Sequence, residues 1–290
     1  MKKVLITGAD SFIGTSFEIY MEQFDGYQID TVDMIDGLWR EKSFNGYDSV
    51  FHVAGIAHSD TGKVSEDRKR FYYQINTDLT IETAKKAKED GVRQFIFMSS
   101  AIVYGDSAPI GELRRITRDT PVSPSNFYGD SKVQAENGLT KLADNSFHVV
   151  ILRPPMIYGK GSKGNYPQLS KFAQKLPIFP NIKNERSMLY IGNLAEFVKL
   201  MIDNDENGVF YPQNSEYVAT SDMVKAIARA HGKKVRLVKG TTVPLKAMSH
   251  VSGLVNKAFG NLSYDMDLSE YKQDYRKFSL EESIKQTEAE

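Results

Sequence analysis

The chain has 290 residues, with 37 basic and 37 acidic side chains and no cysteine. Balanced charge argues against an electrostatic nucleic-acid partner, and the lack of cysteine excludes disulfides, thiolate zinc sites and a cysteine nucleophile. No stretch reaches the roughly 18 apolar residues of a membrane span. We therefore expect a cytoplasmic protein with a main and a minor lobe, no membrane span and no nucleic-acid partner.

Short apolar stretches alternate with helical patterns over the first 153 residues. Strands are predicted at 3–7, 27–33, 48–55, 93–100 and 147–153, and helices at 12–24, 77–90 and 128–142. Nearly continuous apolar strands separated by helices indicate an α/β fold with a doubly wound parallel sheet covered on both faces. Ligands of such sheets bind beyond the carboxyl ends of the strands, so the loops after those strands are the expected site.

The composition shifts to Pro, Gly, Lys and Asn from about residue 154, and helices are predicted again near 193–203, 221–231 and 279–288. We expect a nucleotide-binding domain over 1–158, to which the segment 187–205 returns, and a smaller substrate-binding lobe over 159–290. Lysines and arginine mix with apolar residues between 233 and 258. A solvated face of the second lobe is favoured there over a membrane-surface helix.

The segment "TGADSFIG" joins the first strand to the first helix and contains two glycines, Gly8 and Gly14. Such a turn points backbone N–H groups and the helix dipole at an anion. Gly8 suits the tight turn and Gly14 suits close packing of the helix, while Ser11 stands where a third glycine is usual. With Phe12 and Ile13 opening the helix, this loop is a candidate pyrophosphate site.

The second strand supplies a candidate carboxylate for the adenosine ribose. Asp33 lies 19 residues after Gly14, near the spacing expected for a residue that binds the ribose diol. No basic residue follows at once to accept a 2′-phosphate, so NAD is favoured and NADP is the less favoured cofactor. If Asp33 and Met34 instead contact the adenine, Asp30 becomes the rival ribose ligand.

Tyr128 and Lys132, in "NFYGDSK", are four residues apart on a predicted helix and therefore share a face. A free tyrosine has a pKa near 10, and a neighbouring ammonium lowers it toward the range of a useful base. Ser99 and Ser100 end the strand upstream, where a hydroxyl would hold a substrate oxygen. The three residue types together predict proton transfer at a substrate hydroxyl.

Several motifs in register resemble the extended short-chain dehydrogenases/reductases, the NAD-dependent epimerase/dehydratase family typified by nucleotide-sugar epimerases. They are "TGADSFIG", "VFHVAGIAH", "QINTD", "FIFMSSAIVYG", "YGDSK" and "LRPPMIYGKG". The resemblance spans about residues 3–205, and the closing "FSLEESIKQT" looks like the last helix of the family. It implies a Rossmann-type sheet, a nicotinamide cofactor and a nucleotide-sugar substrate.

The resemblance also implies roles for individual residues. Ser100 matches the catalytic hydroxyl, Tyr128 the catalytic base, and Lys132 the partner that also holds the nicotinamide ribose. Arg186 resembles the arginine that binds the substrate diphosphate, a role suited to a bidentate guanidinium. The cofactor residues implied or expected from the motifs are Gly8, Ser11, Phe12, Ile13, Gly14, Asp33, Met34, Ala54, Gly55, Ala57, Asn76, Ser99, Tyr128, Lys132 and Pro154.

The residues after Ser100 bear on the reaction type. Dehydratases of the family have an acidic pair there, and this chain has Ala101 and Ile102, so dehydration is not expected. A 4-epimerase with a transient 4-keto sugar is favoured, a 4-keto-sugar reductase is the alternative, and a non-catalytic dinucleotide sensor is the third reading.

The loops 58–72, 105–127 and 159–186 are expected to select the sugar and base. His148, His231 and His250 are scattered without metal-like spacing, and a homodimer is expected by analogy.

Overall fold

The computed structural model describes residues 1–56, 64–249 and 253–289. Contacts divide the chain into two compact units, each discontinuous in sequence. Unit 1 comprises Met1–Gly105, Pro121–Pro154 and Ala195–Pro212, and unit 2 comprises Asp106–Thr120, Pro155–Leu194 and Gln213–Glu290.

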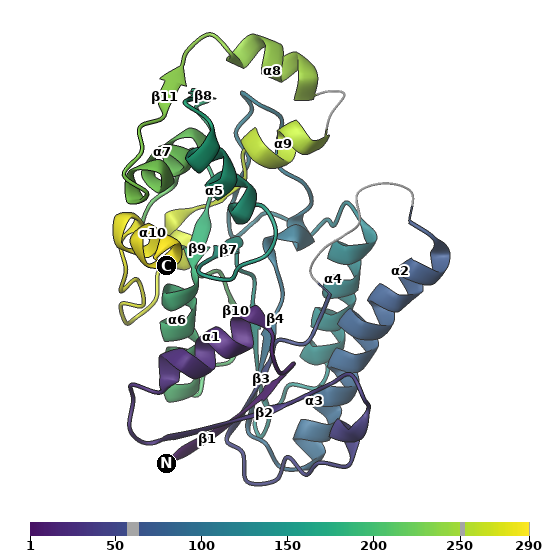
Figure 1. The fold of residues 1–290 in the computed structure, drawn as a ribbon. Helices are drawn as coiled ribbons and strands as arrows, with labels where there is room; N and C mark the ends of the chain where they lie inside the picture. Colours follow the sequence, from purple (N-terminus) through teal and green to yellow (C-terminus); the bar gives the residue numbers. More distant parts are fainter. Residues whose placement is uncertain (57–63, 250–252, 290) are drawn as a thin grey trace. The chain divides into compact units, whose positions relative to one another are not determined.

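A parallel six-stranded sheet forms the middle of unit 1 (Figure 1). Its strands are β1 (Lys2–Thr7), β2 (Tyr27–Val32), β3 (Ser49–His52), β4 (Gln94–Met98), β6 (His148–Leu152) and β10 (Gly208–Phe210), in the order β10-β6-β4-β3-β1-β2. The predicted doubly wound parallel sheet is confirmed. The strand order changes direction at β1, and a topological switch of this kind is where α/β sheets bind ligands.

Helices cover both faces of this sheet, with α1 (Phe12–Met21) and the later part of α6 (Ile191–Asp203) on one face (Figure 1). The other face carries α2 (Glu66–Tyr73), α3 (Leu79–Glu89) and α4 (Phe127–Thr140). Successive side chains of a strand point to opposite faces of the sheet, so each strand contributes to two hydrophobic cores, one on each face. Phe51 faces α1, where its ring centroid lies 5.2 Å from that of Phe17, and the neighbouring Val50 packs with α3 and α4 residues in the other core.

Two elements of unit 1 differ from the sequence prediction. The segment 58–72 was expected to be a loop, but α2 begins at Glu66 after an N-cap in which Ser65 accepts from the Arg68 N–H. Only Tyr72 of that helix is buried, so it has no apolar periodicity to reveal it. Strand β10 was not predicted because it has three residues and lies at the sheet edge, with Val209 40% exposed.

Unit 2 contains α5 (Tyr166–Lys175), α7 (Thr220–Ala230), α8 (Thr242–Ser249), α9 (Gly253–Phe259) and α10 (Leu280–Glu288). Its strands form three parallel pairs: β7 (Met156–Tyr158) with β9 (Met188–Tyr190), β8 (Ile178–Pro180) with β11 (Arg236–Val238), and β5 (Arg115–Ile116) with β12 (Ser263–Tyr264). Helix α5 falls in the predicted loop 159–186, so that expectation was wrong. Within the described ranges, no helix has the length and apolarity needed to span a membrane.

Candidate functional site

Two glycines, Gly8 in the loop between β1 and α1 and Gly14 in the first turn of α1, have little room for a Cβ. Gly8 has a φ of +93°, and a Cβ there would lie 2.9 Å from the backbone nitrogen of Ala54. A Cβ on Gly14 would lie 2.7 Å from Ser11 Oγ. Ser11 Oγ accepts from the Gly14 N–H at 3.1 Å and so caps α1. The serine in place of the usual glycine therefore has a structural task at the helix start.

The first turn of α1 presents backbone donors with no acceptor inside the helix. The N–H groups of Phe12 and Ile13 precede the first intrahelical bond, which Thr15 donates to Ser11 O. Among the described residues, no backbone acceptor is found for either group. Together with the positive end of the helix dipole, these donors make a site that suits a diphosphate.

Asn76 fixes the backbone that follows β3. Its Oδ1 accepts from the Ile56 N–H at 2.8 Å, and its Nδ2 donates to Ile56 O at 3.2 Å. Asn76 is fully buried in the π-helical turn Gln74–Asp78. A Cβ on Gly55 would lie 3.1 Å from Asn76 Oδ1 and 3.4 Å from Lys132 Nζ. The structure thus brings Gly55, Asn76 and Lys132 together, while Ala57 lies outside the described residues.

Tyr128 lies in the first turn of α4, whose N-cap Asn126 accepts from the Gly129 N–H. Burial raises the pKa of Tyr128 to about 12, and its interaction with the Ser100 side chain opposes that shift. Ser100 caps the short 3-10 helix Ala101–Tyr104 by accepting from the Ile102 N–H at 3.2 Å. The predicted hydroxyl and phenol are therefore neighbours, and the free chain holds the phenol protonated at neutral pH.

Lys132 lies one turn further along α4 and is 5% exposed. Its Nζ donates to Met98 O at 2.9 Å and lies 4.7 Å from the ring centroid of Phe97. Burial lowers the pKa of Lys132 to about 8, and the charge of Glu136 opposes that shift. Lys132 Nζ lies near Gly55, in the loop after β3. A cation in this position, with a pKa close to neutrality, is able to donate to a ribose hydroxyl and to stabilise the phenolate form of a tyrosine.

A buried ion pair below Lys132 was not found from the sequence. Arg153 Nη2 donates to Glu136 Oε2 at 2.6 Å, and Arg153 Nη1 donates to Tyr104 OH at 2.7 Å. Ser99 Oγ donates to Glu136 Oε1, so the side chain of Ser99 is committed to this network. Glu136 lies four residues after Lys132 on the same helical face, and that spacing is the one signal in the sequence.

The two candidate ribose carboxylates differ in position. Asp33 follows the end of β2, is exposed, and accepts from the Ile35 N–H at 3.0 Å. Asp30 lies within β2, and its Oδ2 accepts from Tyr47 OH at 2.8 Å and from Gln28 Nε2 at 3.0 Å. Met34 is buried in the core on the α3 and α4 side. Asp33 is thus the carboxylate at the carboxyl end of the sheet.

The remaining predicted residues lie at the end of β6 and in unit 2. Pro154 O accepts from the Ala101 N–H at 2.9 Å, which joins the end of β6 to the segment after Ser100. Arg186 belongs to unit 2, is half-buried, and its Nη1 donates to Ala258 O at 3.5 Å. Burial lowers the pKa of Arg186 to about 10. Unit 2 therefore holds a partly desolvated guanidinium.

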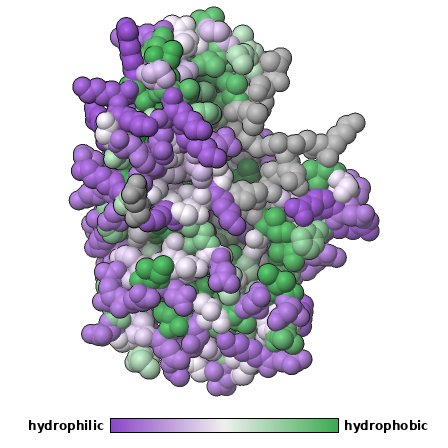
Figure 2. Space-filling model, in the orientation of Figure 1, coloured by the Kyte–Doolittle hydropathy of each residue, from purple (hydrophilic) through white to green (hydrophobic). Residues whose placement is uncertain are grey.

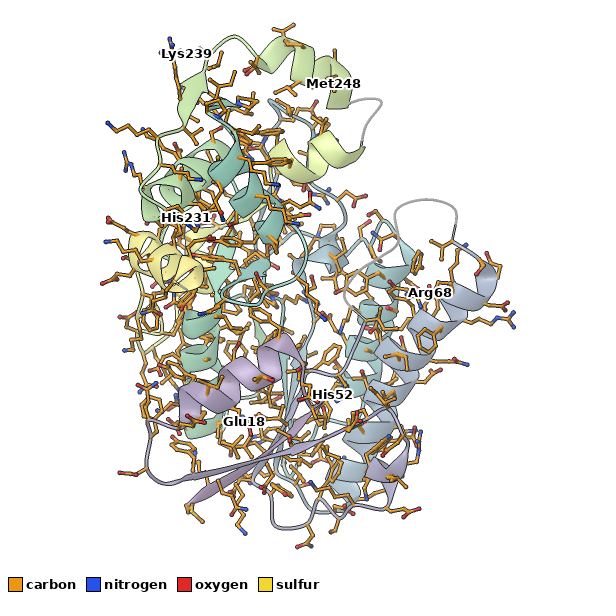
Figure 3. The ribbon with its side chains drawn as sticks, in the orientation of Figure 1. Glu18, His52, Arg68, His231, Lys239 and Met248 are labelled. Atoms are coloured by element: carbon orange, nitrogen blue, oxygen red, sulfur yellow. The ribbon has the colours of Figure 1, made fainter. Side chains whose placement is uncertain are left out.

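His52 is a core residue (Figure 3). Its Nδ1 lies 2.7 Å from Thr7 Oγ1 and its Nε2 lies 3.0 Å from Thr80 Oγ1, and burial lowers its pKa to about 3. Across the described parts of the chain, no cluster of three metal-ligating side chains is present.

Comparison with known proteins gives one family. The model of the NAD dependent epimerase/dehydratase family matches residues 4–212. The chain is 33% identical to a UDP-glucose 4-epimerase of Vibrio cholerae over 254 residues, which is 80% of this chain and 76% of that protein.

Two solved structures share the fold. A UDP-glucuronic acid 4-epimerase from Bacillus cereus in complex with NAD has 18% identity and a TM-score of 0.69, and the match covers 98% of this chain and 96% of that one. A dTDP-4-dehydrorhamnose reductase from Bacillus anthracis in complex with NADP has 18% identity and a TM-score of 0.72, with 99% of both chains covered. At these identities the two structures bear on the fold alone.

Proposed function

The chain belongs to the NAD dependent epimerase/dehydratase family and is an enzyme of the extended short-chain dehydrogenase/reductase type, and from that premise we propose that it is a nucleotide-sugar 4-epimerase. The observation that carries the proposal is the site of unit 1, in which Ser100 and Tyr128 are neighbours and buried Lys132 lies one turn beyond them. The relative of Vibrio cholerae is a UDP-glucose 4-epimerase, which favours UDP-hexoses as the first substrates to test.

The loops of unit 1 fit a nicotinamide dinucleotide. The N–H groups of Phe12 and Ile13 suit the diphosphate, and a Cβ on Gly8 would crowd the Ala54 backbone beside that turn. Lys132 is within reach of the backbone around Gly55. When bound, the nicotinamide supplies the acceptance and return of a hydride.

The chain itself supplies the proton transfer. The Ser100 hydroxyl orients the sugar 4-hydroxyl, and the Tyr128 oxygen takes its proton and later returns one. A phenol whose pKa is about 12 is a poor base at neutral pH, so the positive charge of Lys132 and of the oxidised cofactor has to lower it. In this proposal Lys132, one turn further along α4, has the role of stabilising the phenolate.

NAD is the proposed cofactor, with Asp33 as the ligand of the ribose diol. A carboxylate at the end of β2 binds a diol and repels a 2′-phosphate. The first basic residue after β2 is Arg40, and both its Nε and Nη2 donate to Glu82, at 2.5 and 2.7 Å. Its charge is therefore committed to an ion pair.

The substrate diphosphate is assigned to Arg186 of unit 2. Its guanidinium has a pKa lowered to about 10 by burial, and a diphosphate compensates such a desolvated cation well. Ala101 and Ile102 stand where dehydration would need carboxyl groups, and Ala101 is 5% exposed. These residues support epimerisation over water loss.

The test is conversion of UDP-glucose to UDP-galactose, and the reverse, by the purified protein without added reductant. We expect conversion in both directions with no net change in reduced nicotinamide. If instead the protein consumes reduced nicotinamide stoichiometrically with a nucleotide 4-keto sugar and does not interconvert the epimers, it is a reductase. Absence of both reactions across a nucleotide-sugar panel, with the dinucleotide still bound, would point to a sensor.

A further inference from the structure

We propose that unit 2 docks on anionic lipid membrane surfaces through an exposed basic and apolar region, here called its basic face, which carries Lys175, Ile178, Arg236, Lys239, Val243 and Met248. This face joins the end of α5, the β8–β11 pair and α8. Ile178 pairs with Arg236 across β8 and β11, so the two side chains lie next to each other, and both are exposed. Lys239 follows β11, and α8 begins three residues later.

The cations of this face have no acidic neighbours in sequence. No aspartate or glutamate occurs from 145 to 184 or from 223 to 264. The first segment contributes α5 and β8, and the second contributes β11 and α8. In a chain whose total charge is zero, the pairing of β8 with β11 thus brings parts of the two acid-free segments side by side.

Large apolar side chains are exposed among these cations. Ile178 is 56% exposed, Val243 is 78% exposed and Met248 is 51% exposed. No side chain from Thr242 to Met248 of α8 is buried. Figure 3 shows Lys239 and Met248 extending outward near β11 and α8, and Figure 2 shows hydrophobic and hydrophilic residues side by side there.

Exposed cations and exposed aliphatic side chains occur together on this face, and this combination indicates the class of partner. A groove for single-stranded nucleic acid combines cations with stacked aromatic residues, and a duplex is bound through polar and charged contacts to its phosphates, whereas this face mixes cations with exposed aliphatic side chains. An anionic bilayer interface accepts both, since the phosphates attract Lys and Arg and the acyl boundary accepts Ile, Val and Met. An anionic lipid bilayer is therefore the occupant to which we commit.

The experiment is co-sedimentation of the full chain with phosphatidylcholine vesicles, prepared with and without phosphatidylglycerol, at low and high salt. We expect binding only to the vesicles that contain phosphatidylglycerol, weakened by salt. Equal binding to neutral vesicles, or no binding to either, overturns the proposal. Binding to a DNA duplex in place of vesicles also overturns it.

Two double variants locate the surface. Each cation near an anionic membrane contributes about 1 kcal/mol, or about fivefold in affinity, so Arg236→Gln with Lys239→Gln should weaken binding about thirtyfold. Val243→Ser with Met248→Ser should weaken it about tenfold through lost apolar burial.

A matched control removes two exposed lysines of unit 1, Lys85→Gln with Lys141→Gln, and should leave vesicle binding unchanged. Equal losses in the control and in the first variant would show that total charge, and not this face, governs binding. Vesicle binding needs no sugar substrate, so the outcome is independent of the epimerase assay.

Discussion

The two units differ in the environment of their cationic side chains. In unit 1, Lys132 is buried and the side chain of Arg153 is 11% exposed, and each has a defined partner: Met98 O for Lys132 and the Glu136 carboxylate for Arg153. In unit 2, Arg236 and Lys239 are exposed and lie in a segment with no carboxylate. A buried charge costs desolvation and so affects both pKa and stability, while an exposed charge affects encounters with a partner.

This contrast orders the expected effects of substitution. Removing a buried ionisable group of unit 1 should change catalysis or folding strongly. Removing an exposed one should change binding alone.

Tyr128→Phe should lower turnover by about a thousandfold, because the proton acceptor for the sugar hydroxyl is lost. Binding of the dinucleotide should persist, and steady-state assays with cofactor titration measure both. Tyr73→Phe is the matched control, since it removes a hydroxyl that donates to Asp130 at 2.8 Å and should keep full turnover. An active Tyr128→Phe protein would mean that another group moves the proton.

Glu136→Gln should lower the free energy of unfolding by about 3–5 kcal/mol, because it leaves the buried Arg153 guanidinium without its counter-charge. Chemical denaturation measures the change. The double variant Glu136→Gln with Arg153→Met removes both charges and should recover most of the loss. If the double variant is no more stable than the single one, the ion pair is not the source of the effect.

The pH dependence of stability should report the burial of Lys132. Its folded pKa is about 8 against an unfolded value near 10.4, so the unfolded chain binds more protons between these values and stability rises with pH. Between pH 8 and pH 10 the group should contribute a gain of about 2 kcal/mol. Lys132→Met should lack this gain and should be at least as stable as the parent at pH 7, as measured by denaturation across pH.

Much of the fold of unit 1 could be predicted from its sequence, and the elements and contacts that could not be predicted have identifiable physical causes. The strands are apolar enough to be read directly, and the Tyr128–Lys132 spacing gives the helix face. Helix α2 was missed because its sequence, EDRKRFYY, buries only Tyr72. The Glu136–Arg153 pair joins a helix to a strand 17 residues away, and no local pattern encodes such a contact. The two segments without Asp or Glu can be read from the sequence, but only the structure shows that they are neighbours through the pairing of β8 with β11.

Asp33→Ala should weaken NAD binding about tenfold, the loss of about one hydrogen bond to a charged group, and should raise the relative affinity for NADP. Asp33 is exposed and accepts from the Ile35 N–H, its one partner among the described residues, so the stability of the fold should change little. Asp30→Asn, which alters a carboxylate held by Tyr47 and Gln28, is the matched comparison. An effect on cofactor preference from Asp30→Asn and not from Asp33→Ala would reassign the ribose ligand.

Arg236→Ala should change the free energy of unfolding by less than about 0.5 kcal/mol, the smallest effect of the series. The side chain is exposed on β11 beside Ile178 and, within the part of the chain that the structure describes, forms no ion pair, so little of the fold depends on it. Denaturation midpoints in the absence of lipid measure the change, with Lys85→Ala in unit 1 as the control. A loss of unfolding free energy comparable to that of Glu136→Gln would mean that Arg236 stabilises unit 2 itself. The contrast between the cations of unit 1 and the exposed cations of unit 2 would then be wrong.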